Sequence, residues 1–202
     1  MAHRLRDAVR RRGSATLALS GGTSAPPMFD ALLGEEVPWE HIRVWQVDER
    51  IAPDGDPGRN AAQLDPIPAS VELMPVTARD LRAAARRYAA GLPERFDVVH
   101  LGLGDDGHTA SWPPGDPVVE SHRPCELVGD FNGFRRMTLT PSVVNQARSR
   151  LVLTFGRSKA PMVARWLSGD PDLPVDRLRR SGTWVFVDPA AVADVPSTTR
   201  EE

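Results

Sequence analysis

Short apolar runs that end in glycine-rich or charged turns recur along this chain, and segments with helical periodicity separate them. Such runs cover residues 14–20, 42–47, 96–101, 150–155 and 183–187. Their apolar and β-branched residues favour strands buried on both faces, and the helical segments between them favour parallel strands joined by crossovers. We therefore expect an α/β fold in which a mostly parallel sheet is flanked by helices on both faces, in a doubly wound, Rossmann-like arrangement.

The segments outside these runs complete the outline. Residues 1–12 predict a helix that ends at Gly13, and residues 78–92 predict an amphipathic helix. A proline-rich stretch with little periodicity predicts a small irregular or β excursion around 112–140. We expect one domain over residues 1–195 and a polar, disordered tail over 196–202.

Composition narrows the class of protein. The chain has 202 residues and a formal net charge of −2, which argues against a nucleic-acid-binding surface. Its N-terminal residues hold no continuous apolar stretch, so we expect neither a signal peptide nor a membrane span. The one cysteine, Cys125, can form no internal disulfide and no cysteine-based metal site. These features favour a cytoplasmic protein without a nucleic-acid or membrane partner, and we expect a monomer or weak homodimer.

The first apolar run enters the turn Gly21-Gly22-Thr23-Ser24, and a helical segment follows it. Glycines in such a turn let backbone N–H groups approach a ligand closely, and the start of the helix presents its positive end to an anion. Phosphate is the ligand that this arrangement suits. The alternative is a tight turn that needs glycine for backbone reasons alone.

Three further turns carry charged side chains. Residues 102–111 include Asp105, Asp106 and His108, while Asp48-Glu49-Arg50 and Gly156-Arg157-Ser158-Lys159 each follow another strand-like run. Because the carboxyl ends of parallel strands share one edge of a sheet, and ligands bind there, these turns predict a common site. Taken alone, the loop 102–111 is equally compatible with a solvated connection.

Five blocks, in order along nearly the whole chain, resemble motifs of the 6-phosphogluconolactonase family, within the superfamily that also holds glucosamine-6-phosphate deaminases. The blocks are 19–23, 48–50 with Asn60, 101–111 continuing to Pro114-Gly115, 136–140 and 156–160. The third block resembles the family signature Gly-x-Asp-Gly-His-Thr-Ala-Ser. The resemblance implies hydrolysis of 6-phosphoglucono-1,5-lactone in the oxidative pentose phosphate pathway, with neither a metal nor an organic cofactor.

The resemblance also implies roles for individual residues. His108 would act as a general base toward water, a role that suits an imidazole near neutral pH. Asp48 would orient that imidazole or the water, and Arg50 would hold substrate oxygens or the developing oxyanion. The implied substrate- and phosphate-binding set is Gly21, Gly22, Thr23, Asn60, Gly107, Arg136 and Lys159. Within it, Arg136 and Lys159 would pair with phosphate, although Arg136 has the alternative of a carboxylate partner.

One acidic residue and several aromatic residues outside this set are interpreted as structural. Asp106 is expected to shape its turn by bonding to its own backbone. Four of the five tryptophans are interpreted as packing residues, namely Trp45, Trp112, Trp166 and Trp184, and Trp112 has the alternative of a recognition role because it adjoins the signature.

The sequence departs from the family pattern at three places. Arg59 stands where a serine usually precedes the asparagine, Asp105 replaces a proline, and Trp112-Pro113-Pro114 replaces a Leu-Phe-Pro type sequence. Arg59 is expected to add a phosphate contact or to crowd the pocket.

Two other functions compete with lactone hydrolysis. An amino-sugar-phosphate deaminase or isomerase is disfavoured, because no carboxylate follows His108 before Asp116. A non-catalytic sugar-phosphate sensor is the other, and the intact Asp48, Arg50 and His108 argue against it.

Overall fold

The computed structural model describes residues 1–196, so the predicted polar tail lies outside the described residues from Ser197 onward. Within this range no helix combines the length and the apolar composition that crossing a membrane requires. The predicted helix at the N-terminus is α1 (Ala2–Arg12), and Gly13 ends it in a left-handed conformation with φ of 77°.

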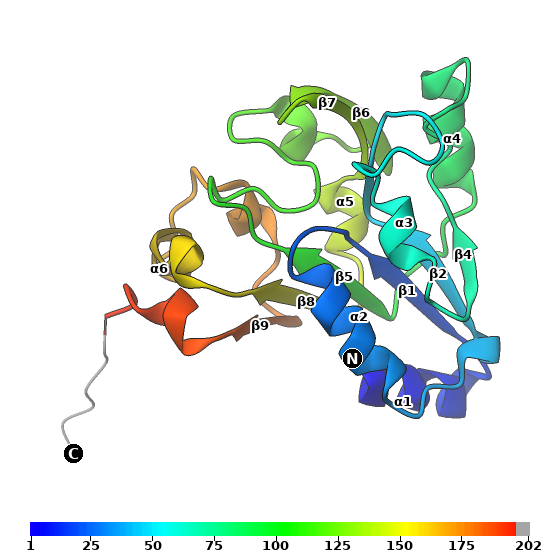
Figure 1. Ribbon diagram of the computed structural model, residues 1–202, viewed down its shortest axis with the longest axis horizontal. Coiled ribbons are helices and arrows are strands. Elements are labelled where there is room, and N and C mark those ends of the chain that lie inside the picture. The colour runs from blue at the N-terminus through cyan, green and yellow to red at the C-terminus, as the bar shows by residue number, and fades with distance from the viewer. Residues whose placement is uncertain (197–202) are drawn as a thin grey trace.

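A six-stranded parallel sheet forms the centre of the molecule, as the alternation of strand-like runs and helices predicts (Figure 1). Its strands are β1 (Ala15–Leu19), β2 (Ile42–Gln46), β4 (Ser70–Glu72), β5 (Val98–Gly102), β8 (Ser149–Thr154) and β9 (Thr183–Val187). They lie in the order β4-β2-β1-β5-β8-β9, and every pairing is parallel. The chain thus builds the sheet outward from β1 in one direction, and then outward from β5 in the other. The junction of β1 and β5 is a topological switch point, where ligands bind in folds of this kind.

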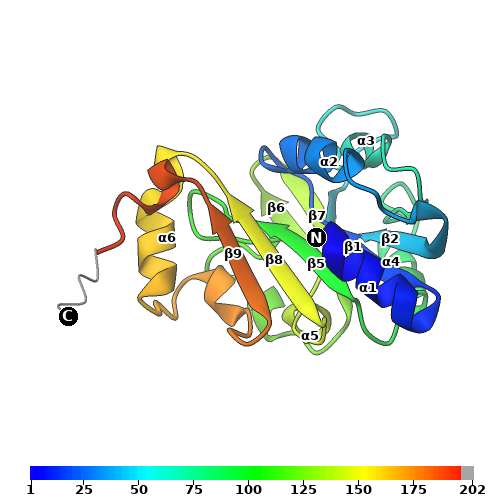
Figure 2. The same cartoon turned by 90° about the horizontal axis from the view of Figure 1, so that it is seen from below.

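Helices cover both faces of this sheet, and each face has its own apolar core. One core joins α1, α2 (Ala25–Leu33) and α3 (Ala61–Leu64) to β1 through side chains such as Leu5, Phe29 and Leu17. The other core joins α4 (Leu81–Ala90), α5 (Pro141–Val144) and α6 (Ala160–Leu167) to the opposite face. Figure 2 shows α1 lying across the first face and β9 at the outer edge of the sheet. The predicted two-sided covering is confirmed.

The predicted excursion around 112–140 is a second, antiparallel sheet beside the carboxyl edge of the first. It consists of β3 (Asp48–Arg50), β7 (Phe134–Leu139) and β6 (Cys125–Phe131), in the order β3-β7-β6. The run 42–47 is a strand up to Gln46 as predicted, but Asp48-Glu49-Arg50, expected to be a turn, forms β3 after a break at Val47. Its amide donates to Leu19 of the large sheet (2.9 Å), and its carbonyl accepts from Leu139 of the small sheet (2.7 Å). The chain therefore passes from one sheet to the other just before Asp48.

Three of the four tryptophans predicted to pack in the interior do so, since Trp45, Trp112 and Trp166 are buried. Trp112 packs under the small sheet and donates from Nε1 to the Leu139 carbonyl (2.8 Å). The prediction is wrong for Trp184, which is 52% exposed on β9 beneath the guanidinium of Arg4. α1 packs on β1 rather than on this edge strand, and its Arg4 side chain reaches outward to the ring of Trp184.

Candidate active site

A cavity of about 380 Å³ lies at the carboxyl edge of the large sheet, beside the switch point. It is lined by Ser20, Gly21, Gly22, Thr23, Ser24, Asp48, Arg50, Asn60, Gly102, Leu103, Gly104, His108, Ala110, Arg136, Thr154, Phe155 and Lys159. Four separate turns or strands thus meet in one place. Among the predicted site residues, the one missing from this lining is Gly107. Its N–H donates to the Gly104 carbonyl (3.1 Å), and its Cα packs on Leu173, so in the structure it shapes the turn.

The turn after β1 offers backbone amides to the cavity, but fewer than the sequence suggests. The amide of Gly22 is already bonded to Oε1 of Gln63 (3.0 Å), and Pro26 and Pro27 remove two donors from the first turn of α2. Within the described chain, the amides of Gly21, Thr23 and Ser24 have no protein acceptor. These three N–H groups form a small concave donor set, which is the kind of backbone geometry that binds anions.

The small sheet places two guanidinium groups on the cavity wall. Arg50 on β3 lies directly opposite Arg136 on β7 in the antiparallel register. Like charges in such cross-strand positions destabilise a sheet unless an anion lies between or beside them. Arg50 donates to the Gly58 carbonyl, and Arg136 donates twice to the Phe131 carbonyl (3.2 and 2.8 Å). Because carbonyl partners carry no net charge, both cations keep their positive charge available to a ligand. No described carboxylate lies within ion-pair distance of Arg136, so its predicted alternative is not what the structure shows.

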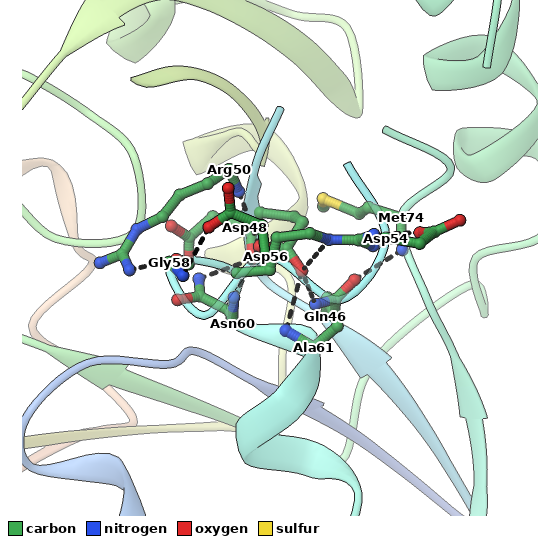
Figure 3. A network of polar contacts seen from close by, with 11 residues as sticks. Gln46, Asp48, Arg50, Asp54, Asp56, Gly58, Asn60, Ala61 and Met74 are labelled. Carbon is green, nitrogen blue, oxygen red and sulfur yellow. Dashed lines mark hydrogen bonds and ion pairs between the residues drawn. The ribbon is translucent and has the colours of Figure 1, made fainter. Parts of the chain in front are cut away.

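Glu49, fully buried, fixes the loop that carries Asn60. Its two carboxylate oxygens accept from the amides of Arg50 (2.7 Å), Asn60 (2.7 Å) and Ala61 (2.8 Å), and also from Nε2 of Gln46 (2.8 Å). Asn60 in turn donates from Nδ2 to the Asp48 carbonyl (3.0 Å). Figure 3 shows these contacts between the end of β2 and the start of α3. The side chain of Asn60 is thereby held at the cavity wall, against the Cα of Gly21.

Asp48 is buried beneath the cavity between two serines. Its Oδ2 accepts from Oγ of Ser111 (2.7 Å), and its Oδ1 accepts from Oγ of Ser20 (3.2 Å). Burial raises the pKa of the Asp48 carboxyl above its usual range, and the hydrogen bond from Ser111 and the charge of Arg136 oppose that rise. The expected contact between Asp48 and the imidazole of His108 is not among the hydrogen bonds of residues 1–196.

The imidazole of His108 is oriented instead by Asp106, whose Oδ1 lies 2.5 Å from Nδ1. The same oxygen accepts from the backbone amide of His108 (3.1 Å), so Asp106 also shapes the turn as predicted. The ring packs edge-on against Phe131, with centroids 4.9 Å apart. A side chain on Gly104 would collide with Nδ1, which explains why glycine stands there. With Nδ1 committed to a carboxylate, the Nε2 atom carries the lone pair that accepts a proton.

The pKa of Asp106 is consistent with this pairing. Burial raises it, but the hydrogen bonds from the ring and the amide of His108 outweigh burial and lower the pKa below its usual value. Asp106 therefore stays a carboxylate, and it fixes the proton of the imidazole on Nδ1.

Lys159, in the turn after β8, reaches the cavity as predicted. Its Nζ forms an ion pair with Oδ1 of Asp105 (2.9 Å). The backbone amides of Gly21, Thr23 and Ser24 lie at the other end of the cavity. Lys159 follows β8 and these amides follow β1, so they reach the cavity from the two sides of the switch point.

Sequence reasoning missed the two serines that hold Asp48. Ser20 and Ser111 flank the first glycine turn and the signature, so their positions were visible, but nothing in the sequence indicates that they meet at one carboxylate. Among the described residues, no group of three His, Cys, Asp or Glu side chains is arranged to hold a metal ion.

Comparison with known proteins now identifies the chain. The sequence profile of the family described as glucosamine-6-phosphate isomerases/6-phosphogluconolactonase matches residues 1–186. The chain belongs to this family. A 6-phosphogluconolactonase of Synechocystis sp. is 36% identical over 174 residues, which cover 77% of this chain and 72% of that protein.

Solved structures show the same fold. A 6-phosphogluconolactonase from Shewanella baltica superposes with a TM-score of 0.84 at 25% identity, covering 92% of this chain and 88% of the other. A monomeric glucosamine-6-phosphate deaminase superposes almost as well, with a TM-score of 0.81 at 21% identity over 96% and 94% of the two chains. The fold is therefore common to both branches of the family, and the site has to distinguish them.

The departures from the family pattern fall in different environments. Arg59 lies outside the cavity lining, since its guanidinium pairs with Asp54 and with the buried Glu49 (3.5 Å). Both expected effects of Arg59, a phosphate contact and a crowded pocket, are therefore wrong. Trp112 is a packing residue, whereas Asp105 meets Lys159 at the mouth of the cavity.

Proposed function

We propose that this chain hydrolyses 6-phosphoglucono-1,5-lactone to 6-phosphogluconate, a step of the oxidative pentose phosphate pathway, without a metal or an organic cofactor. The observation that carries the proposal is the pair formed by His108 and Asp106 at a cavity that also holds three cationic side chains. A lactone needs an activated water and a stabilised oxyanion, and its phosphate needs positive charge. The cavity offers groups for all three requirements.

The phosphate binds at the end of the cavity formed by the first turn and Lys159. The amides of Gly21, Thr23 and Ser24 donate to its oxygens, and Lys159 and Arg136 supply charge. Hydrogen bonds between ionised partners are the stronger kind, so these contacts fix the position of the sugar ring. Asn60 lines the same wall and contacts the ring oxygens.

His108 performs the proton transfers. Its Nε2 removes a proton from water, and the oxygen of that water forms a bond to the lactone carbonyl carbon. Arg50 stabilises the negative oxygen of the tetrahedral intermediate. The bond from the carbonyl carbon to the ring oxygen then breaks, and the imidazolium returns its proton to that oxygen, giving the open-chain acid. Asp106 holds the imidazole in place through both transfers.

Asp48 acts beneath the reacting groups. The carboxylate lies between Ser20 and Ser111, and the nearby charge of Arg136 compensates it. Since the structure pairs the imidazole with Asp106, we assign Asp48 the second of its expected roles, which is to order the attacking water through these two hydroxyl groups.

The deaminase alternative lacks a further carboxylate at the cavity. Asp116, the first carboxylate after His108, accepts from the amide of Val118 (2.8 Å) and is absent from the cavity lining. The sensor alternative retains the anion site but makes no use of the His108–Asp106 pair. We further propose that the protein is cytoplasmic, because its one cysteine is buried and can form no internal disulfide, and that it is a monomer or weak homodimer.

One experiment separates the three functions. Acid release from freshly generated 6-phosphogluconolactone and ammonia release from glucosamine 6-phosphate are followed for the wild type and for His108→Ala. We expect the wild type to release acid well above the buffer rate, and the variant to lose that activity. Lactone hydrolysis no faster than in buffer would overturn the proposal, and thermal stabilisation by the sugar phosphate without turnover would favour the sensor.

A further inference from the structure

Lys159 is the only lysine in the sequence, and its ammonium group is paired with a carboxylate of the same chain. Its Nζ lies 2.9 Å from Oδ1 of Asp105. The lysine side chain is 17% exposed and lines the cavity, whereas the Asp105 side chain is 69% exposed and lies outside the lining. The carboxylate thus reaches inward from the rim to a cation held in the wall.

The other two cavity cations are not neutralised in this way. Arg50 donates to the Gly58 carbonyl, and Arg136 donates to the Phe131 carbonyl, neither of which carries a net charge. Among the three cations, only Lys159 forms an ion pair within the described residues. An anionic ligand can approach the two arginines directly, but it has to displace a carboxylate to reach the lysine.

The turn that carries Asp105 does not depend on this ion pair. The Gly104 amide bonds to the His108 carbonyl (2.8 Å), and the Gly107 amide bonds to the Gly104 carbonyl (3.1 Å). Asp106, rather than Asp105, holds the imidazole. A released Asp105 carboxylate turns into water at little cost because it is already largely exposed. The exchange of one anion for another therefore leaves the proton-transfer pair intact.

We propose that Asp105 is an intramolecular anion that competes for Lys159 and is displaced by the phosphate of the substrate. The identity of the substrate rests on the function proposed above, while the exchange at Lys159 applies to any phosphate ligand. A tethered competitor weakens the binding of every ligand that needs Lys159 by the same factor. It leaves the binding of a ligand without phosphate unchanged. Asp105 is thereby a specificity-determining residue that lowers the preference for phosphorylated lactones.

Removal of the carboxylate tests this proposal directly. In Asp105→Asn we expect the KM for the phosphorylated lactone and the Kd for inorganic phosphate to fall by about two- to fivefold, the range that a partly exposed ion pair supports. We expect kcat to stay within about twofold of the wild type, because no proton-transfer group changes. The KM for unphosphorylated gluconolactone should not change.

Two matched variants locate the effect. Glu94→Gln removes an exposed carboxylate near the opposite edge of the sheet and should change neither constant. In a Lys159→Met background, Asp105→Asn should have no further effect, since the competitor has lost its target. Selective ¹³C-lysine labelling gives one Cε signal from this chain. Addition of phosphate should move that signal in the wild type toward the position it has in phosphate-saturated Asp105→Asn.

The sign of the change decides the outcome. A rise of KM and of the phosphate Kd in Asp105→Asn would show that the carboxylate positions Lys159 for the ligand, and it would overturn the proposal. An unchanged KM and an unchanged phosphate Kd in Asp105→Asn would also overturn the proposal. If wild-type turnover is intact while these constants do not fall, only the inference about Asp105 fails. If turnover is absent but phosphate binds more tightly to Asp105→Asn, only the proposed reaction fails.

Discussion

The two sheets of this chain differ in which ionisable groups they bury and in whether those groups face the cavity. In the large sheet, His100 lies on β5 with both ring nitrogens unpartnered in the described chain, and burial lowers its pKa to about 4, so it is neutral. The small sheet and the turns beside it bury Asp48, Glu49 and Arg136, each with polar partners. The large sheet thus keeps His100 neutral and holds the buried guanidinium of Arg150 on β8 among backbone carbonyls outside the cavity lining, while the small sheet concentrates charge at the cavity.

This difference assigns separate tasks to the two sheets. The turns of the large sheet supply backbone amides, the His108–Asp106 pair and Lys159, all of which follow the ends of strands. The small sheet supplies its charged groups from within strands, so their spacing is fixed by the antiparallel register. Substitutions in the small sheet should therefore change electrostatics, and those in the large sheet should change geometry or folding.

The largest effect is expected from Arg50→Gln in the small sheet. Loss of the cation opposite the developing oxyanion should lower kcat by about 10²- to 10³-fold, with a smaller change in KM. The measurement is steady-state lactone hydrolysis. Arg135→Gln, an exposed neighbour on β7 that lies outside the cavity, is the matched control. A rise in KM with kcat preserved would show that Arg50 binds the ground state instead.

The interior of the large sheet should respond to acid. His100 binds its proton at a pKa of about 4 in the folded chain, against about 6.5 when unfolded, so the wild type should lose stability as pH falls through this window. The loss in the free energy of unfolding approaches about 3 kcal/mol once the pH lies below both pKa values. Urea unfolding at pH 7 and pH 4.5 should show a smaller loss for His100→Leu. Equal losses in both proteins, or a difference reproduced by exposed His122→Gln, would contradict this assignment.

Asp106→Asn tests whether the large sheet contributes orientation. Without a carboxylate at Nδ1 the imidazole is no longer fixed in one tautomer, and we expect kcat to fall about 10- to 100-fold while KM and Tm stay near the wild-type values. Asp172→Asn, on an exposed loop, serves as the control. A clear fall in Tm together with the loss of kcat would indicate a structural role for Asp106 instead.

The smallest effect is expected in the stability of Asp48→Asn. Because burial raises the pKa of Asp48, its ionised form costs stability at neutral pH, and the neutral amide should raise Tm at pH 7.5 by roughly 2–4 °C, for about 1 kcal/mol in a chain of this size. The gain should shrink as the pH is lowered and the wild-type carboxyl takes up its proton. Turnover should fall at the same time. A lower Tm at neutral pH would show that the carboxylate stabilises the small sheet.

Much of the fold and the membership of the site followed from local patterns. The alternation of apolar runs and helical segments determined a parallel sheet with two covered faces, because period and polarity report which faces are buried. Since parallel strands place their carboxyl ends together, the turns at Gly21, Asp48, His108 and Lys159 were expected to meet, and they line one cavity.

Only the tertiary structure decided which partner each group has. Local spacing does not reveal that Val47 carries the chain between two sheets, that Ser20 and Ser111 meet at Asp48, or that Asp105 reaches Lys159. These contacts join residues 28 to 63 positions apart in the case of Asp48. Hydrogen bonds and ion pairs depend on the distance and direction of two atoms, and the packing of the sheets sets both.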